Sequence, residues 1–101
     1  MNKSRRICII TGAGSGIGRE TALLFLENGY KVALAGRNQE TLNETINQSK
    51  KYANNALSIS TDITNQKSIQ NLFKNVKNTF GRLDVLFNNA GIGAQPTLFE
   101  E

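Results

Sequence analysis

Histidine is absent from this chain of 101 residues, and Cys8 is its single cysteine. Because histidine and cysteine are the side chains that most often hold transition metals, we expect no metal site. One cysteine permits no intrachain disulfide, and Cys8 lies inside an apolar run, which predicts a buried and inert thiol. The alternative, a redox role for Cys8, would need a second cysteine or basic groups reaching into the core.

Long hydrophobic runs and long charge runs are missing too. No stretch approaches the roughly 18 apolar residues of a membrane span, and no charged-then-apolar leader precedes the first predicted strand. We therefore expect a soluble, cytoplasmic protein with no membrane partner. The net charge is +4, much of it supplied by Lys3, Arg5 and Arg6 near the N-terminus. Because no five like charges occur in a row and no basic and aromatic residues interleave, we expect no nucleic-acid partner.

What the chain does contain is a glycine-rich loop after a short apolar run. The stretch from Ile7 to Gly18 reads Ile-Cys-Ile-Ile-Thr-Gly-Ala-Gly-Ser-Gly-Ile-Gly. An apolar run of this length before turn residues is typical of a strand buried on both faces, and residues 16–28 have a helical pattern. Glycines at a helix N-terminus let a phosphate reach backbone N–H groups, because no Cβ intervenes. A flexible turn is the alternative interpretation of the loop.

The spacing of this loop excludes two common phosphate motifs. A Walker A loop needs Gly-Lys-Ser/Thr, whereas Gly18 is followed by Arg19 and Glu20. The fingerprint G-x-G-x-x-G fails as well, because Ile17 and Arg19 stand where its third glycine would be. The pattern that fits is T-G-x-x-x-G-x-G, with Thr11, Gly12, Gly16 and Gly18 at the fixed positions.

Strands and helices alternate along the rest of the chain. Further strands are predicted at residues 31–35, 56–61 and 83–87. Helix 16–28 shows helical spacing of Ile17, Thr21, Leu24 and Phe25 along one face and ends at Gly29. A second helix follows an Asn38 cap, with Leu42, Ile46, Ser49 and Ala53 on its apolar face. A third is predicted to be capped by Thr64 and to end at Gly81, with Ile69, Leu72, Phe73, Val76 and Phe80 on one face.

This alternation predicts the fold class α/β: a Rossmann-like, doubly wound parallel sheet in three αβα layers. The strand order should be 3-2-1-4, with the sheet truncated after its fourth strand. Such a fold has a ligand crevice beside its first strand. The glycine loop and the segment Asn88-Asn89-Ala90-Gly91 should meet there, because each follows a strand that borders the crevice.

The end of the second strand bears on the choice of cofactor. An NAD-binding fold usually has an acid there for the ribose hydroxyls, whereas this chain has Gly36-Arg37. The glycine leaves room for a 2′-phosphate, and the guanidinium of Arg37 matches its oxygens. A charge-assisted contact of about 1.5 to 3 kcal/mol would favour NADP over NAD by roughly tenfold to a hundredfold. The alternative is a solvated surface charge.

Four motifs in this order resemble the classical branch of the short-chain dehydrogenase/reductase family. They are the glycine loop, Gly36-Arg37, Asp62-Ile63 after the third strand, and Asn88-Asn89-Ala90-Gly91. The resemblance implies that Asp62 bonds the adenine amine, Ile63 packs beside the ring, and Asn89, Ala90 and Gly91 line the ribose side. A capping carboxylate and a generic Asn/Gly turn are the alternatives. The implied cofactor site comprises Gly12, Ser15, Gly16, Ile17, Gly18, Arg37, Asp62, Ile63, Asn89, Ala90 and Gly91.

The family's catalytic residues are missing from this segment. Its tyrosine is followed four residues later by a lysine, whereas Tyr30 is followed by Leu34 and Tyr52 by Ala56. The family's serine, tyrosine, lysine and asparagine would lie beyond residue 101, so no catalytic residue is assigned. The resemblance implies that residues 1–101 are the N-terminal part of an NAD(P)-binding Rossmann domain. It further implies an NADP-preferring oxidoreductase acting on a small carbonyl or alcohol substrate, of which this chain carries only the cofactor-binding half. Alternatives are a truncated, non-catalytic nucleotide-binding fragment and a nucleotide-sugar or flavin-using relative.

Lateral association is the remaining expectation. A sheet that ends with its fourth strand leaves an unpaired edge and uncovered apolar faces, which favour aggregation. We therefore expect the isolated segment to be aggregation-prone or only partly folded. The resemblance implies a homo-oligomer only for the full-length protein.

Overall fold

The structure, a computed structural model, describes residues 6–89 of the chain. Strands and helices alternate from one end of this range to the other. In chain order they are β1 (Ile7–Thr11), α1 (Gly16–Glu27), β2 (Lys31–Gly36), α2 (Gln39–Ser49), the 3₁₀ helix η1 (Lys50–Asn55), β3 (Ala56–Ser60), α3 (Gln66–Phe80) and β4 (Val85–Phe87). No helix among residues 6–89 is long and apolar enough to cross a membrane.

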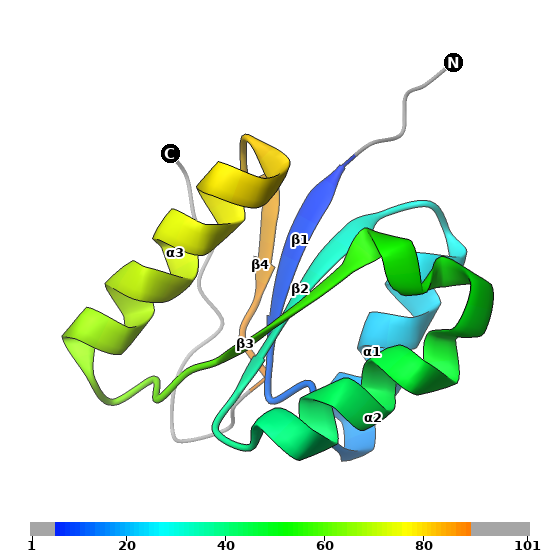
Figure 1. Cartoon of the computed structure of the whole chain (residues 1–101), viewed down its shortest axis with the longest axis horizontal. Coiled ribbons are helices and arrows are strands. Elements are labelled where there is room, and N and C mark those ends of the chain that lie inside the picture. The colour runs from blue at the N-terminus through cyan, green and yellow to red at the C-terminus, as the bar shows by residue number, and fades with distance from the viewer. Residues whose placement is uncertain (1–5, 90–101) are drawn as a thin grey trace.

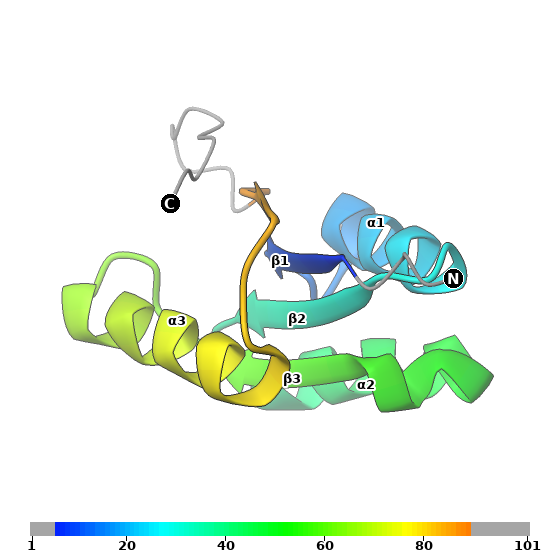
Figure 2. The same ribbon diagram turned by 90° about the horizontal axis from the view of Figure 1, so that it is seen from above.

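The four strands form one parallel sheet in the order β3-β2-β1-β4, as the sequence predicts. Strand β1 is central: Ile9 lies opposite Ala33 of β2 on one side and Leu86 of β4 on the other. All five β1 residues are buried, because helices cover both faces of the sheet. Helices α1 and α2 lie on one face and α3 on the other, which gives the three predicted layers (Figures 1 and 2).

Alternating side chains of the strands supply the two halves of the core. Cys8, Ile10 and Leu34 pack with Leu26 of α1 and Leu42 of α2. The intervening residues point to the other face, where Ile9 and Ala33 pack with Leu72 and Val76 of α3. This division follows from the two-residue period of a strand, since neighbours in sequence point to opposite faces.

The prediction for the apolar face of α1 is wrong. Ile17 and Leu24 are 70% and 56% exposed, whereas Gly18, Ala22 and Leu26 are buried. Small residues face the sheet because the helix backbone comes close to the glycine loop at Gly18, where a side chain would not fit. Glycine and alanine contribute little to a hydrophobic pattern, so the larger exposed residues dominated the prediction.

Helix α2 is capped by Asn38 as predicted, with the Asn38 Oδ1 accepting hydrogen bonds from the N–H groups of Glu40 and Thr41. It ends at Ser49, however, before the predicted Ala53. The backbone of Lys50 has a φ of 54°, a left-handed conformation that ends the α-helix, and η1 follows. Thr45 takes a buried position between Leu42 and Ser49 on the same face.

The predicted cap of α3 at Thr64 is also wrong. Asn65 is the cap, because its Oδ1 accepts a hydrogen bond of 3.0 Å from the N–H of Ser68. The Thr64 hydroxyl instead donates to Asp62 Oδ1 at 2.6 Å. The helix ends at Gly81 as predicted, with Gly81 in the left-handed conformation.

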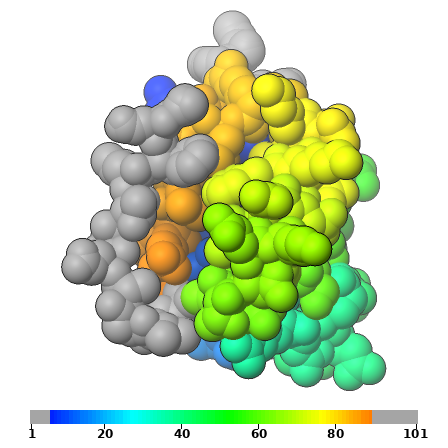
Figure 3. All heavy atoms as spheres, turned by 90° about the vertical axis from the view of Figure 1, so that its left-hand side faces the viewer, coloured from blue at the N-terminus to red at the C-terminus, as the bar shows by residue number. Residues whose placement is uncertain are grey.

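Strand β4 is shorter than predicted, and a side chain secures its start. Asp84 accepts a hydrogen bond of 2.8 Å from the N–H of Ile7, and the Asp84 N–H donates to the Ile7 carbonyl at 3.0 Å. Within residues 6–89, β4 pairs only with β1. Figure 3 shows β4 in orange beside α3, and Phe87 of this strand is 39% exposed.

Candidate functional site

The glycine loop and the amide-rich segment after β4 meet at the carboxyl ends of β1 and β4. The Thr11 hydroxyl donates a hydrogen bond of 2.9 Å to Asn88 Oδ1. The same hydroxyl oxygen accepts one of 2.7 Å from the backbone N–H of Asn89. The side chain of Thr11 therefore joins the glycine loop to Asn88 and Asn89, which lie 77 and 78 residues further along the chain. The predicted convergence of these two motifs is confirmed for the residues that the structure describes.

Close packing accounts for the first and last glycines of the motif. A Cβ at Gly18 would overlap the carbonyl oxygen of Gly12 and would lie 2.8 Å from Asn89 Nδ2. A Cβ at Gly12 would lie 3.0 Å from the Asn89 carbonyl oxygen. These two glycines bring the loop, the start of α1 and the end of β4 together, so they shape the site from within the protein.

Gly16 differs from its neighbours because its backbone faces open space. A Cβ there would meet nothing within 4 Å, yet its φ of 55° is one that L side chains rarely adopt. Ser15 and Ile17, on either side, are exposed, and the Ser15 side chain makes no capping hydrogen bond to α1. The first turn of α1 thus presents backbone N–H groups next to an accessible surface, which is how proteins bind phosphate groups.

Arg37 and Asp62 lie next to each other at the carboxyl ends of β2 and β3. Arg37 Nη2 is 3.3 Å from Asp62 Oδ1, and the two side chains are 69% and 45% exposed. The Asp62 oxygen also accepts hydrogen bonds from the hydroxyl and the N–H of Thr64. These two bonds, together with the charge of Arg37, lower the pKa of Asp62 below its usual value. Asp62 is therefore a carboxylate near neutral pH and offers an acceptor.

The explanation for Gly36 changes. A Cβ there would lie 3.3 Å from Leu42 Cδ2, so Gly36 allows β2 to pack closely on α2. The space beside it belongs to the core, so Arg37 is the only one of the two residues left to recognise a 2′-phosphate.

The remaining predicted residues divide into two groups. Ile63 follows Asp62 directly and is half-buried. Ala90 and Gly91 lie outside the described residues. The four strands run parallel, so their carboxyl ends lie at one edge of the sheet, toward the bottom of Figure 1.

Sequence reasoning missed two residues next to the site, Arg19 and Thr45. Arg19 served only to exclude a Walker A loop, yet its guanidinium donates to the Gly14 carbonyl at 2.6 Å. Thr45 carried no prediction, yet it is fully buried and donates to the Ala13 carbonyl at 2.9 Å. The spacing of Leu42, Thr45 and Ser49 on one helix face is a signal that predicts the burial of Thr45.

These features fit a dinucleotide. Backbone donors at the start of α1 suit a pyrophosphate, the carboxylate of Asp62 suits an amine donor, and the guanidinium of Arg37 suits an additional phosphate. The open space at Gly16 gives such a group access to the backbone.

Comparison with known proteins agrees with this geometry. An uncharacterized oxidoreductase of Staphylococcus aureus strain MW2 is 44% identical over 86 residues, which are 85% of this chain and 36% of that protein. An actinorhodin polyketide ketoreductase solved with NADPH superposes with a TM-score of 0.82 at 31% identity, over 90% of this chain and 35% of that one. A 3-ketoacyl-(acyl-carrier-protein) reductase from Brucella melitensis, complexed with NADH, gives 0.79 at 32% identity, over 91% and 36%.

The chain therefore spans little more than a third of the length of the relatives it matches. The family model for short chain dehydrogenases matches residues 6–101, which is nearly the whole chain. The sequence motifs, the 3-2-1-4 sheet and the meeting of the two segments agree with that match. The chain belongs to the short-chain dehydrogenase family.

Proposed function

We propose that this chain forms the cofactor-binding part of an NADP-preferring oxidoreductase, which moves hydride between a nicotinamide and a small carbonyl or alcohol substrate. The cofactor supplies the redox chemistry, and the protein supplies binding and orientation. Thr11 holds the two segments together, the first turn of α1 binds the pyrophosphate, and Asn89 lies on the ribose side.

One observation carries the proposal: the glycine loop and Asn89 border the same site, with Gly16 facing open space. If the glycines served only as a flexible turn, the convergence with Asn89 would not be required. The relatives solved with NADPH and with NADH make either nicotinamide cofactor a reasonable ligand.

The preference for NADP rests on Arg37. Its guanidinium is exposed at the end of β2, and its partner Asp62 is itself exposed. An ion pair between exposed groups is weak, so a 2′-phosphate, with its higher charge, can take the place of the carboxylate. No acid at residue 36 or 37 is available to accept hydrogen bonds from the ribose hydroxyls of NAD.

The test is a fluorescence titration of the intact protein, produced from its complete coding sequence, with NADPH and with NADH. We expect tighter binding of NADPH by roughly tenfold to a hundredfold, and Arg37→Ala should remove that difference. Arg82→Ala is the matched control, because Arg82 is likewise an exposed arginine paired with an aspartate but lies just before β4, at the end of the sheet away from the site. Equal affinity for both nucleotides would show that Arg37 does not select NADP. Binding of neither nucleotide would contradict the proposed function.

The same proposal includes a cytoplasmic location and a homo-oligomer for the full-length protein. An unpaired outer edge of β4 within residues 6–89 is consistent with further chain or a partner packing there. Sedimentation of the intact protein tests for the proposed homo-oligomer, and a monomer would contradict it.

A further inference from the structure

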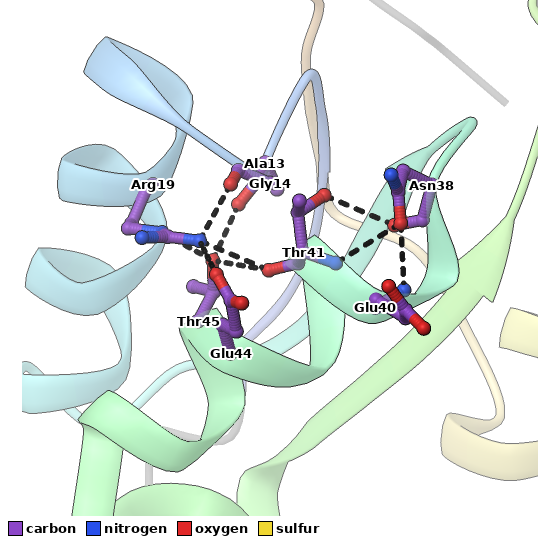
Figure 4. A network of polar contacts seen from close by, with 8 residues as sticks. All are labelled: Ala13, Gly14, Arg19, Asn38, Glu40, Thr41, Glu44 and Thr45. Carbon is purple, nitrogen blue, oxygen red and sulfur yellow. Dashed lines mark hydrogen bonds and ion pairs between the residues drawn. The ribbon is translucent and has the colours of Figure 1, made fainter.

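We infer that Arg19 is a positioning residue for cofactor binding: it fixes the orientation of the peptide groups of the glycine loop. The inference rests on the proposed function, because it concerns how the same loop recognises a pyrophosphate. Arg19 lies in the first turn of α1, and its side chain is 20% exposed. It points toward Thr41, Glu44 and Thr45 of α2 (Figure 4).

The guanidinium of Arg19 bridges three parts of the fold. Its Nη2 donates to the Gly14 carbonyl at 2.6 Å and to the Thr41 carbonyl at 3.1 Å. Its Nε donates to the Thr45 hydroxyl at 2.8 Å. Glu44 completes the set at 3.3 Å, but its side chain is 61% exposed, so this ion pair contributes little. The two hydrogens of Nη2 match the Gly14 and Thr41 carbonyls while Nε serves Thr45, so Glu44 shares a donor with them. An ammonium has a single nitrogen and cannot donate from two such fixed, separate positions.

Thr45 extends the bridge to the preceding peptide. With its oxygen accepting from Arg19 Nε, the Thr45 hydroxyl donates to the Ala13 carbonyl at 2.9 Å. The carbonyls of Ala13 and Gly14, two consecutive residues of the loop, are thus both held on the side of α2 (Figure 4).

Holding these carbonyls also sets the direction of the N–H groups. A trans peptide is planar, so the N–H of each bond points away from its carbonyl. With the Ala13 and Gly14 carbonyls turned toward α2, the N–H groups of Gly14 and Ser15 are directed away from α2. The loop is therefore oriented before a ligand arrives, which reduces the ordering cost of binding.

Close packing at Gly14 reinforces this arrangement. A Cβ at Gly14 would overlap the hydroxyl of Thr41. That hydroxyl is in turn held by a hydrogen bond of 3.0 Å to the Asn38 carbonyl, at the N-terminus of α2. The loop, the guanidinium and the first turn of α2 consequently form one rigid unit.

The experiment compares ligands with and without a diphosphate on the intact protein. Arg19→Met should weaken binding of NADPH and of ADP by about tenfold, because both place a diphosphate against the loop. Binding of 2′-AMP, which has no 5′-phosphate, should stay within twofold of wild type. The affinities of Arg19→Lys for NADPH and ADP should fall between those of wild type and Arg19→Met, since an ammonium can reach the Gly14 carbonyl but not all the acceptors. Glu44→Gln, the matched control, should leave all three affinities within twofold.

Thr45→Val is the second variant, to be used if Arg19→Met fails to fold. It keeps the guanidinium but removes the donor to the Ala13 carbonyl, so it should also weaken ADP more than 2′-AMP. Unchanged ADP binding, or equal weakening of ADP and 2′-AMP, would overturn the inference. A wild-type protein that binds neither NADPH nor NADH would overturn the proposed function and this inference with it. A wild-type protein that binds NADPH while its variants bind ADP normally would overturn the inference alone.

Discussion

Arg37 and Asp62 form an ion pair at the ends of two neighbouring strands, with Nη2 and Oδ1 3.3 Å apart. Both residues belong to the proposed adenosine end of the cofactor site. Each side chain would therefore interact both with the other residue and with the cofactor. A carboxylate beside the guanidinium reduces the positive potential available to a 2′-phosphate. The ion pair should therefore make the proposed preference for NADP smaller than Arg37 alone would give.

Replacing Asp62 should reveal this competition. In Asp62→Asn the affinity for both nucleotides should fall, because the adenine acceptor is altered, yet the ratio of NADPH to NADH affinity should rise roughly twofold to fivefold. Titrations at low and high salt check the cause, since the change in ratio should shrink as salt screens the charges. A ratio that falls, as in Arg37→Ala, would show that Asp62 supports the phosphate contact.

Two glycines of the loop should respond differently to alanine. Gly18→Ala should lower the free energy of unfolding by about 3 kcal/mol, because the new methyl group overlaps the Gly12 carbonyl. Gly16→Ala should cost only about 1 kcal/mol, the strain of a left-handed alanine, while weakening NADPH binding at least tenfold. Urea unfolding and nucleotide titration of the intact protein measure both effects. If Gly16→Ala binds NADPH as tightly as wild type does, Gly16 does not contribute to the nucleotide site.

Asp84 should make stability depend on acid pH. Partial burial alone would raise its pKa, but the N–H of Ile7 and the guanidinium of Arg82 outweigh this effect and lower the pKa below the usual 3.8. The carboxylate thus favours the folded state above about pH 4, and this contribution disappears as the pH falls through the lowered pKa. The difference in thermal midpoint between wild type and Asp84→Asn should therefore shrink from about pH 5 to about pH 3.

The control for this measurement is Glu27→Gln, which removes an exposed acid at the end of α1. This variant checks that removing an exposed acid does not by itself reproduce the change expected for Asp84→Asn. A difference for Asp84→Asn that is constant with pH would mean that the charge of Asp84 contributes nothing to stability.

Cys8 should resist alkylation in the folded protein. Its side chain is fully buried, and burial raises the pKa of the thiol to about 12. At pH 8.5 the thiol is therefore almost entirely un-ionised, and reagent access is blocked as well. Iodoacetamide followed by peptide mass spectrometry should find Cys8 unmodified in buffer and modified in urea. Rapid labelling in buffer would place Cys8 at an accessible surface.

Much of the fold was predictable because it depends on strong local patterns. Apolar runs such as Ile7 to Ile10 predict buried strands, and their alternation with helices predicts a doubly wound parallel sheet, for which 3-2-1-4 is the Rossmann order. The glycine spacing and Asn88-Asn89 likewise predicted that the loop and the segment after β4 would meet. For these features the apolar pattern, the turn residues and the motif spacing all indicate the same fold.

The errors have a common physical origin in three-dimensional packing. The buried face of α1 depends on how closely Gly18 can approach the Gly12 carbonyl, which no hydrophobic pattern expresses. Whether Thr64 or Asn65 caps α3 depends on Asp62, which attracts the threonine hydroxyl. The role of Arg19 depends on an orientation of α2 against the loop that is absent from the local sequence.

The hydrogen bond between Thr11 and Asn89 joins two ends of the described chain, 78 residues apart. Closing so long a loop is slow, because its entropy is lost before the contact is gained. During synthesis the ribosome must release nearly the whole segment before β4 can reach β1. Nucleotide affinity should therefore emerge late in translation, after α3 has already had time to fold.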